Sequence, residues 1–217
     1  MPSHTIEEYL ETIYKLSENG PVRPARIAEA IGVSGPTVTA TLRRLGRDGY
    51  VARPHGMVEL TEAGRRAALD VVRRHRVAER FLADVLKLPW ADVHEEACRL
   101  EHALSPTVVS ALEAFMENPD TCPHGHPIPA KDGKISPRQG VPLATVGRGT
   151  EVVILRVDED EEGLLGHLAS RGLFPGTRIA VLDASPFDGA LLIESGPARF
   201  ALSREAASRI VVEPVGE

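Results

Sequence analysis

Residues 93–102 read Val-His-Glu-Glu-Ala-Cys-Arg-Leu-Glu-His and lie between Pro89 and the Ser105-Pro106 pair. Their spacing predicts a helix, on which successive residues are about 100° apart. Four side chains that can bind a metal then share one flank of it, namely His94, Cys98, Glu101 and His102. They border an apolar stripe of Val93, Ala97, Leu100 and Leu104. Polar groups beside a buried face need partners, which indicates a metal site. An amphipathic helix with a solvated His/Glu face is the alternative.

Composition limits the class of protein. The chain has 217 residues, enough for two or three small domains, and 42% of them are apolar. No apolar run approaches the roughly 18 residues of a membrane span, and the first ten residues lack a signal-peptide pattern. Two cysteines are too few for a disulfide framework. We therefore expect a cytoplasmic protein with no membrane segment.

Charge is distributed unevenly along the chain. The net charge is −6, but residues 1–76 hold 12 Lys and Arg against 9 Asp and Glu, whereas residues 77–217 hold 13 against 22. A DNA contact is therefore expected in the first third. The acidic remainder suits cations or solubility.

The first third has the pattern of a helix-turn-helix. Apolar residues at helical spacing from Ile6 to Leu16 predict a first helix. A short helix over 24–31, a tight turn at 32–34 and a second helix over 35–47, capped by Ser34, then follow. Two short strands, at 50–53 and 57–60, would add a wing.

The helix over 35–47 is the one that we expect to read DNA. Hydroxyl and guanidinium groups are the ones that contact phosphates and base edges. The residues that we expect to contact DNA are Ser34, Pro36, Thr37, Thr39, Arg43, Arg47 and, in the wing, Arg53. A winged helix that serves protein interaction instead is the alternative.

A long helix that Thr61 is expected to cap follows the wing and runs to about Leu86. Its apolar surface is broader than one winged-helix core requires, which suggests a dimer interface. His75 and Glu79 lie one turn apart on it, a common spacing of metal ligands, although a surface pair would look the same. Imidazole, carboxylate and a single thiol together suit a divalent first-row metal. Ser105 and Pro106 are expected to cap a further helix that runs to about Glu117.

The C-terminal third is predicted to be β-rich. A Pro-rich linker over 119–142 precedes five short strands between 151 and 213, with a short helix near 164–173. This pattern favours a small SH3-like barrel. No nucleophile constellation appears, so we expect no enzyme activity. Packing on the metal domain, donation of a ligand and a passive stabilising role all remain open for the barrel.

The predicted fold class is therefore a mainly α N-terminal two-thirds followed by an all-β SH3-like small barrel. The α part combines a winged helix-turn-helix with a helical dimerisation and metal domain. The expected boundaries are 1–70 for the winged helix, 71–142 for the helical domain with its linker, and 143–217 for the barrel.

Four stretches resemble the diphtheria toxin repressor family of bacterial iron- and manganese-dependent transcription regulators. They are Ser-Gly-Pro-Thr at 34–37, Arg-His-Arg-Val-Ala-Glu-Arg at 74–80, the stretch at 93–102, and Pro-His-Gly-His-Pro-Ile-Pro at 123–129. Residues 168–177, Leu-x-x-Arg-Gly-Leu-x-Pro-Gly-Thr, are similar to the FeoA-type domain of ferrous-iron transport accessory proteins. The resemblance covers nearly the whole chain.

The resemblance implies two metal sites. One would be formed by Glu8, Cys98, Glu101 and His102, and the other by His75, Glu79 and His94. Glu11 matches an additional carboxylate of the manganese-responsive branch. Some manganese regulators of the family also clamp the second site with residues that here are Cys122 and His124, Glu79, and one of Asp160, Glu161 and Glu162. An incidental Cys and His in a Pro-rich linker is the alternative for the first two.

The metal preference is read from departures from the family pattern. Iron-responsive members typically carry Met at the position of Glu8, and manganese-responsive members carry Asp there and Glu at the position of Cys98. A carboxylate in place of a thioether hardens the site and favours Mn²⁺. The thiol of Cys98 leaves Fe²⁺ open.

The expected function is a homodimeric, metal-activated regulator, a repressor of metal-homeostasis genes, that binds an inverted-repeat operator in double-stranded DNA. One alternative is a winged-helix regulator that senses a signal other than metal. Another is a metal-dependent hydrolase with water at an open site, which would leave the winged helix unexplained.

Overall fold

The computed structural model describes residues 3–18, 20–136, 139–158, 163–184 and 189–215. Their contacts divide the chain into two units. The first unit comprises Met1–His75, Cys98–Val109 and Pro129–Ile135, and the second comprises Arg76–Ala97, Ser110–Ile128 and Ser136–Glu217. The three-domain division with boundaries after residues 70 and 142 stays a prediction.

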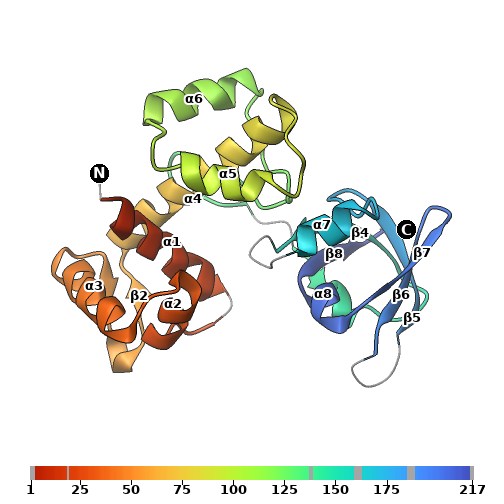
Figure 1. Cartoon of the computed structure of the whole chain (residues 1–217), viewed down its shortest axis with the longest axis horizontal. Helices are drawn as coiled ribbons and strands as arrows, with labels where there is room; N and C mark the ends of the chain where they lie inside the picture. The colour runs from red at the N-terminus through yellow and green to blue at the C-terminus, as the bar shows by residue number, and fades with distance from the viewer. Residues whose placement is uncertain (1–2, 19, 137–138, 159–162, 185–188, 216–217) are drawn as a thin grey trace. The chain divides into compact units, whose positions relative to one another are not determined.

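The first unit contains the expected helix-turn-helix and wing (Figure 1). Gly32, with φ of 74°, ends the first helix of the motif, and Ser34 accepts a bond from the Thr37 amide to begin the second. In the wing, Val51 pairs with Leu60. The elements are α1 (His4–Glu18), α2 (Pro24–Ile31), α3 (Gly35–Arg47), β1 (Val51–Ala52), a 3-10 turn (Pro54–Gly56) and β2 (Glu59–Leu60).

One apolar core joins α1 to α3. The side chains that α1 buries belong to the same cluster as those of α3, and the start of α4 (Glu62–Asp84) completes it. Its members include Ile6, Leu10, Ile13, Ile27, Val38, Leu42, Leu45, Leu69 and Val72. Because these side chains are close-packed, α1 and α3 move together.

The helix that carries His94 and Cys98 is shorter than predicted. α4 begins at its expected cap, since the Gly64 amide donates to Thr61 Oγ1 at 3.1 Å. The expected helix over 93–102 ends earlier: α5 spans Val93–Leu100, and Glu101 and His102 lie in the turn that follows it. The α conformation is disfavoured just before a proline, so the chain leaves the helix before α6 (Pro106–Phe115) begins. Among the helices that the structure describes, none has the length and apolarity to span a bilayer.

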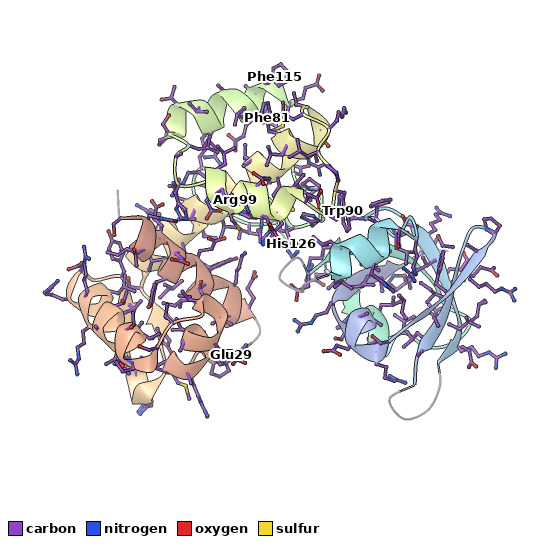
Figure 2. All side chains as sticks on the ribbon, viewed as in Figure 1. Glu29, Phe81, Trp90, Arg99, Phe115 and His126 are labelled. Atoms are coloured by element: carbon purple, nitrogen blue, oxygen red, sulfur yellow. The ribbon has the colours of Figure 1, made fainter. Side chains whose placement is uncertain are left out.

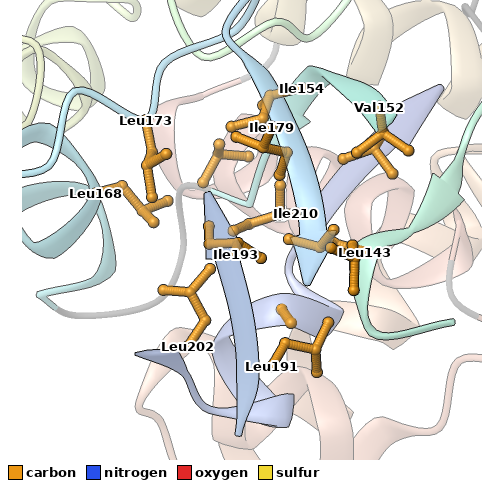
Figure 3. Close-up of a cluster of buried hydrophobic side chains, with 14 of the residues drawn as sticks. Leu143, Val152, Ile154, Leu168, Leu173, Ile179, Leu191, Ile193, Leu202 and Ile210 are labelled. Carbon is orange, nitrogen blue, oxygen red and sulfur yellow. The ribbon is translucent and has the colours of Figure 1, made fainter. Parts of the chain in front are cut away.

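The C-terminal third is all-β apart from short helices, as predicted. Within the described residues its sheet has six antiparallel strands, in the order β3-β8-β4-β5-β6-β7. Its core is closed by apolar side chains from most of these strands (Figure 3). The elements are β3 (Val141–Pro142), a 3-10 turn (Leu143–Thr145), β4 (Glu151–Val157), α7 (Leu164–Ala169), β5 (Arg178–Ala184), β6 (Leu191–Ser195), β7 (Ala198–Leu202), α8 (Arg204–Ser208) and β8 (Ile210–Pro214). The strand beyond the five expected is β3, which pairs with β8.

The close approach of α4 to the wing generates a stability prediction. A Cβ added to Gly64 would overlap the backbone carbonyl of Tyr50, which cannot move without disturbing β1. We expect Gly64→Ala to lower the free energy of unfolding by about 1–3 kcal/mol, measured by urea denaturation. Gly46→Ala in α3 is the matched control, because its added Cβ would have no neighbour nearer than Val51 O at 3.8 Å. Equal effects of the two substitutions would contradict the packing described.

Candidate functional site

The side of α3 predicted to read DNA is open to solvent. Ser34, Pro36 and Thr37 at its start are exposed. Thr39 is half-buried, and its Oγ1 donates to the Gly35 carbonyl oxygen at 3.0 Å. Further exposed side chains are Arg43, Arg47 and, in the wing, Arg53. The DNA contacts stay predictions, but exposed cations and hydroxyls are what contact with phosphates and base edges requires.

Glu11, His75 and Glu101 form a cluster in the first unit, which we call the Glu101 cluster. One ligand atom of each lies within 4.8 Å of the others, and His75 Nδ1 is 2.6 Å from Glu101 Oε2. Two donors on one first-row metal are at most about 4.2 Å apart, twice a bond of about 2.1 Å. A closing movement of a few tenths of an ångström would therefore suit these three donors to one cation.

Two further predicted ligands lie beside the Glu101 cluster. His102 Nε2 is 3.0 Å from Glu101 Oε1, and Cys98 Sγ is 4.0 Å from His75 Nδ1. Cys98 is exposed, so solvent reaches this edge of the cluster. Glu8, predicted as the ligand from α1, is exposed, whereas Glu11 lies inside the cluster. The assignment of Glu8 stays a prediction.

Sequence reasoning missed Glu7, which α1 buries instead of Glu8. Glu7 Oε2 lies 2.8 Å from His102 Nδ1, and Glu7 Oε1 lies 2.9 Å from Arg74 Nη2. Arg74 is only 2% exposed and also donates to the Glu101 carbonyl oxygen at 3.0 Å. Helical periodicity contained the signal: Glu7 is about 20° around the helix from buried Tyr14, whereas Glu8 is about 120° from it.

Burial controls the electrostatics of Glu101. Loss of hydration raises the pKa of its carboxyl above the ordinary value, the nearby Glu11 carboxylate adds to this, and the hydrogen bond from His75 opposes it. Metal ligands must be deprotonated, so a proton competes with a cation for this carboxylate. Affinity for a metal at the Glu101 cluster should therefore fall as the pH is lowered.

Glu79, His94, Cys122 and His124 form a cluster in the second unit, which we call the Glu79 cluster. Ligand atoms of Glu79, Cys122 and His124 lie within 4.8 Å of one another, and all three residues are buried. Glu79 Oε1 is 3.1 Å from His124 Nδ1 and 3.3 Å from His94 Nδ1. The geometry thus brings Cys122 and His124 to the carboxylate with which they were predicted to act.

The orientation of His124 fits a metal ligand. Its Nε2 lies 3.0 Å from the Trp90 carbonyl oxygen, which can only accept, so Nε2 carries the proton. The lone pair of Nδ1 then faces Glu79 Oε1, and two acceptors in this position need a proton or a cation between them. A carbonyl that holds the distal N–H of an imidazole is the usual support of a metal-binding histidine.

The remaining predicted ligands are described as follows. His75 was expected to share a site with Glu79 and His94; within the first unit it contacts Glu101, and its grouping with Glu79 and His94 stays a prediction. The acidic candidates Asp160 and Glu161, with Glu162, fall outside the described residues. The partition of ligands between two metal sites stays a prediction.

The buried Glu7–Arg74 pair generates a prediction. Glu7→Ala would leave the Arg74 guanidinium buried with only the more distant Asp70 carboxylate as a counter-charge. We expect the free energy of unfolding to fall by about 3 kcal/mol, measured by urea denaturation of the metal-free protein. The control is Glu8→Ala in the same helix, expected within about 0.5 kcal/mol of the parent because that side chain is exposed. A larger loss of unfolding free energy for Glu8→Ala than for Glu7→Ala would contradict the burial of Glu7.

Models of known families match three consecutive parts of the chain. Residues 1–55 match the iron dependent repressor N-terminal DNA binding domain, and residues 61–130 match the iron dependent repressor metal binding and dimerisation domain. Residues 141–214 match the FeoA domain.

Individual relatives agree with these matches. The iron-dependent repressor IdeR of Mycobacterium tuberculosis (strain ATCC 25618 / H37Rv) is 41% identical over 227 residues, covering 97% of each chain. The diphtheria toxin repressor of Corynebacterium diphtheriae is 45% identical over 131 residues, covering 59% of this chain and 58% of that one. A manganese-dependent transcriptional repressor solved in complex with manganese superposes with a TM-score of 0.91 at 34% identity, covering 97% of this chain and all of that one. The manganese regulator SloR has a TM-score of 0.80 at 32% identity, with 97% and 98% covered. The chain belongs to the iron-dependent repressor family.

Proposed function

We propose that the chain is a homodimeric transcriptional repressor that binds an inverted-repeat operator when Mn²⁺, or less favourably Fe²⁺, occupies its ligand clusters. The observation that carries this proposal is the burial of Glu11 on α1 against His75 and Glu101. A cation held by these residues would contact α1, which shares its apolar core with α3.

Donor chemistry supports the preference for Mn²⁺. Two of the three donors in the Glu101 cluster are carboxylates, which are hard ligands and suit Mn²⁺ better than they suit softer metals. Cys98 at the edge of this cluster is the feature that favours Fe²⁺. The relatives divide in the same way, since IdeR is named iron-dependent and the structural relative with a TM-score of 0.91 is manganese-dependent.

The residues themselves suggest how a cation would act. A bound divalent cation supplies positive charge that offsets the repulsion between carboxylates lying close together. Glu11 on α1 and Glu101 after α5 would then be held together, with Glu8 completing the set from α1. Because α1 and α3 share one core, fixing α1 fixes the orientation of α3. The cation can shift DNA affinity only by its preference for this arrangement.

Dimerisation is supported by apolar side chains left on the second unit. Phe115 at the end of α6 is 69% exposed, and Leu86 just beyond α4 is 53% exposed. Exposed apolar patches of this kind mark protein interfaces, and the dimerisation-domain model covers α4, α5 and α6. A dimer would present two α3 helices to the two halves of an operator.

Removal of one ligand tests the link between metal and DNA. We expect His102→Ala to abolish the gain in DNA affinity on adding Mn²⁺, a gain of roughly 5- to 150-fold for a typical effector, without dissociating the dimer. Fluorescence anisotropy of labelled operator DNA measures the affinity, and light scattering measures the mass. Glu95→Ala, an exposed acidic position on α5, should keep the gain. A normal Mn²⁺ response in His102→Ala would refute the role of this residue.

The dimer surface gives a second prediction. Phe115→Asp should place a charge in the interface and shift the protein to monomers at micromolar concentration, as read by sedimentation velocity. Leu192→Asp on β6, at a residue that is 36% exposed, should leave the dimer unchanged. A Phe115→Asp variant that stays dimeric would move the interface elsewhere.

A further inference from the structure

The loop 121–127 supplies two residues to the Glu79 cluster and is closed on itself. The Cys122 amide donates to the His126 carbonyl oxygen at 2.9 Å, and the Gly125 amide donates to the Cys122 carbonyl oxygen at 3.0 Å. Thr121 and Pro127 face each other as an isolated β-bridge. Cys122 and His124 are therefore presented from one tight turn.

Two arginines of α4 hold this loop from one side. Arg80 donates to the carbonyl oxygens of Thr121 and Cys122, each at 2.9 Å, and Arg76 donates to the Pro127 carbonyl oxygen at 2.7 Å. The planar guanidinium fork makes such paired bonds directional. Glu79 lies between these arginines in sequence, so one stretch of α4 provides a ligand and anchors the loop.

Strand β4 of the barrel holds the loop from the other side. His126 Nε2 donates to the Val157 carbonyl oxygen at 2.9 Å, and the Val157 amide donates to the His124 carbonyl oxygen at 3.0 Å. Gly125, with φ of 90°, passes so close to β4 that a Cβ there would overlap the Leu155 carbonyl oxygen. Only glycine allows both this conformation and this approach.

Trp90 joins the same assembly. Its indole N–H donates to the Pro123 carbonyl oxygen at 2.9 Å, and its own carbonyl orients His124. Its ring packs against the barrel core and meets Phe174 edge-on, with ring centroids 5.1 Å apart. Trp90 and His126, labelled in Figure 2, both contact the barrel.

We infer that Gly125 and His126 are positioning residues through which the barrel sets the metal affinity of the Glu79 cluster. Neither residue is a ligand in this inference, which rests on the proposed role of the Glu79 cluster as a metal site. Docking on β4 holds Cys122 and His124 beside Glu79 before a cation binds. Cation binding then costs less conformational entropy. By linkage, a cation at the cluster must in turn strengthen the docking of the loop on β4.

Trp90 is a local reporter for the test. It is the only tryptophan of the chain, and its ring centroid lies 4.9 Å from that of His124. Titration of the full-length dimer with Mn²⁺ alone, followed by Trp90 emission, therefore reads the Glu79 cluster without DNA. Metal analysis after dialysis gives the total number of ions bound.

Two loop variants and two controls define the expected result. Gly125→Ala and His126→Ala should each raise the Mn²⁺ concentration at half-change of emission by about 10-fold or more, with the circular dichroism of the parent protein. His126→Gln should restore part of the affinity, because its amide can also donate to Val157. Gly149→Ala is the matched control, since its φ of 83° imposes the same strain but its added Cβ would have no atom within 4 Å. It should titrate like the parent.

Hydrogen exchange of residues 151–157 supplies the reciprocal measurement, and Mn²⁺ should slow it in the parent more than in His126→Ala. The inference is overturned if both loop variants titrate at the parent's Mn²⁺ concentration. If Gly125→Ala does not fold, His126→Ala decides alone. If the parent binds Mn²⁺ but Trp90 does not respond, the Glu79 cluster is not the site and the inference falls. If the parent binds no Mn²⁺ at all, the proposed function falls with it.

Discussion

Burial of carboxylates beside other ionisable side chains is the constraint on which this structure depends. Glu7, Glu79 and Glu101 are each less than 5% exposed. An unpaired buried carboxylate is costly, so each must find a cationic or hydrogen-bonding partner. Arg74 supplies such a partner for Glu7, while Glu79 and Glu101 face histidines instead. A divalent cation at either place would add positive charge beside a buried carboxylate.

The position of these groups explains how one ion could affect DNA binding. Glu7 and Glu11 belong to α1, whose apolar face is part of the core that carries α3. The polar face of the same helix meets Glu101 and His102. α1 thus contributes to the Glu101 cluster and shares a core with α3, the helix that we expect to read DNA. In the second unit the loop 121–127 has a corresponding role. It holds Cys122 and His124 beside Glu79, and it is hydrogen-bonded to β4 of the barrel.

Local signals in the sequence predicted most of the fold. Ser34, Thr61 and Ser105 cap the helices that they were expected to begin, because capping depends on neighbouring backbone groups alone. The helix over 93–102 was predicted too long, since Glu101 continues the helical pattern and the turn before Pro106 could be placed only approximately. Cys98, Glu101 and His102 were expected together and lie near one another. Glu7 was missed, and the pairing of His75 with Glu101 was not expected. Helical periodicity could have identified Glu7 as buried, but its partners and the His75–Glu101 pair depend on contacts between segments distant in sequence, which neither spacing nor the family pattern specifies.

The central claim is that cation binding at the buried carboxylates and DNA binding are one coupled equilibrium. The most direct test is the affinity for Mn²⁺ of the full-length dimer, measured by calorimetry with and without an inverted-repeat duplex selected from random DNA by the Mn²⁺-loaded protein. Linkage requires that DNA tighten Mn²⁺ binding by the same overall factor by which Mn²⁺ tightens DNA binding. We expect equal factors, within roughly 5- to 150-fold. An affinity for Mn²⁺ that is unchanged by DNA would contradict the account.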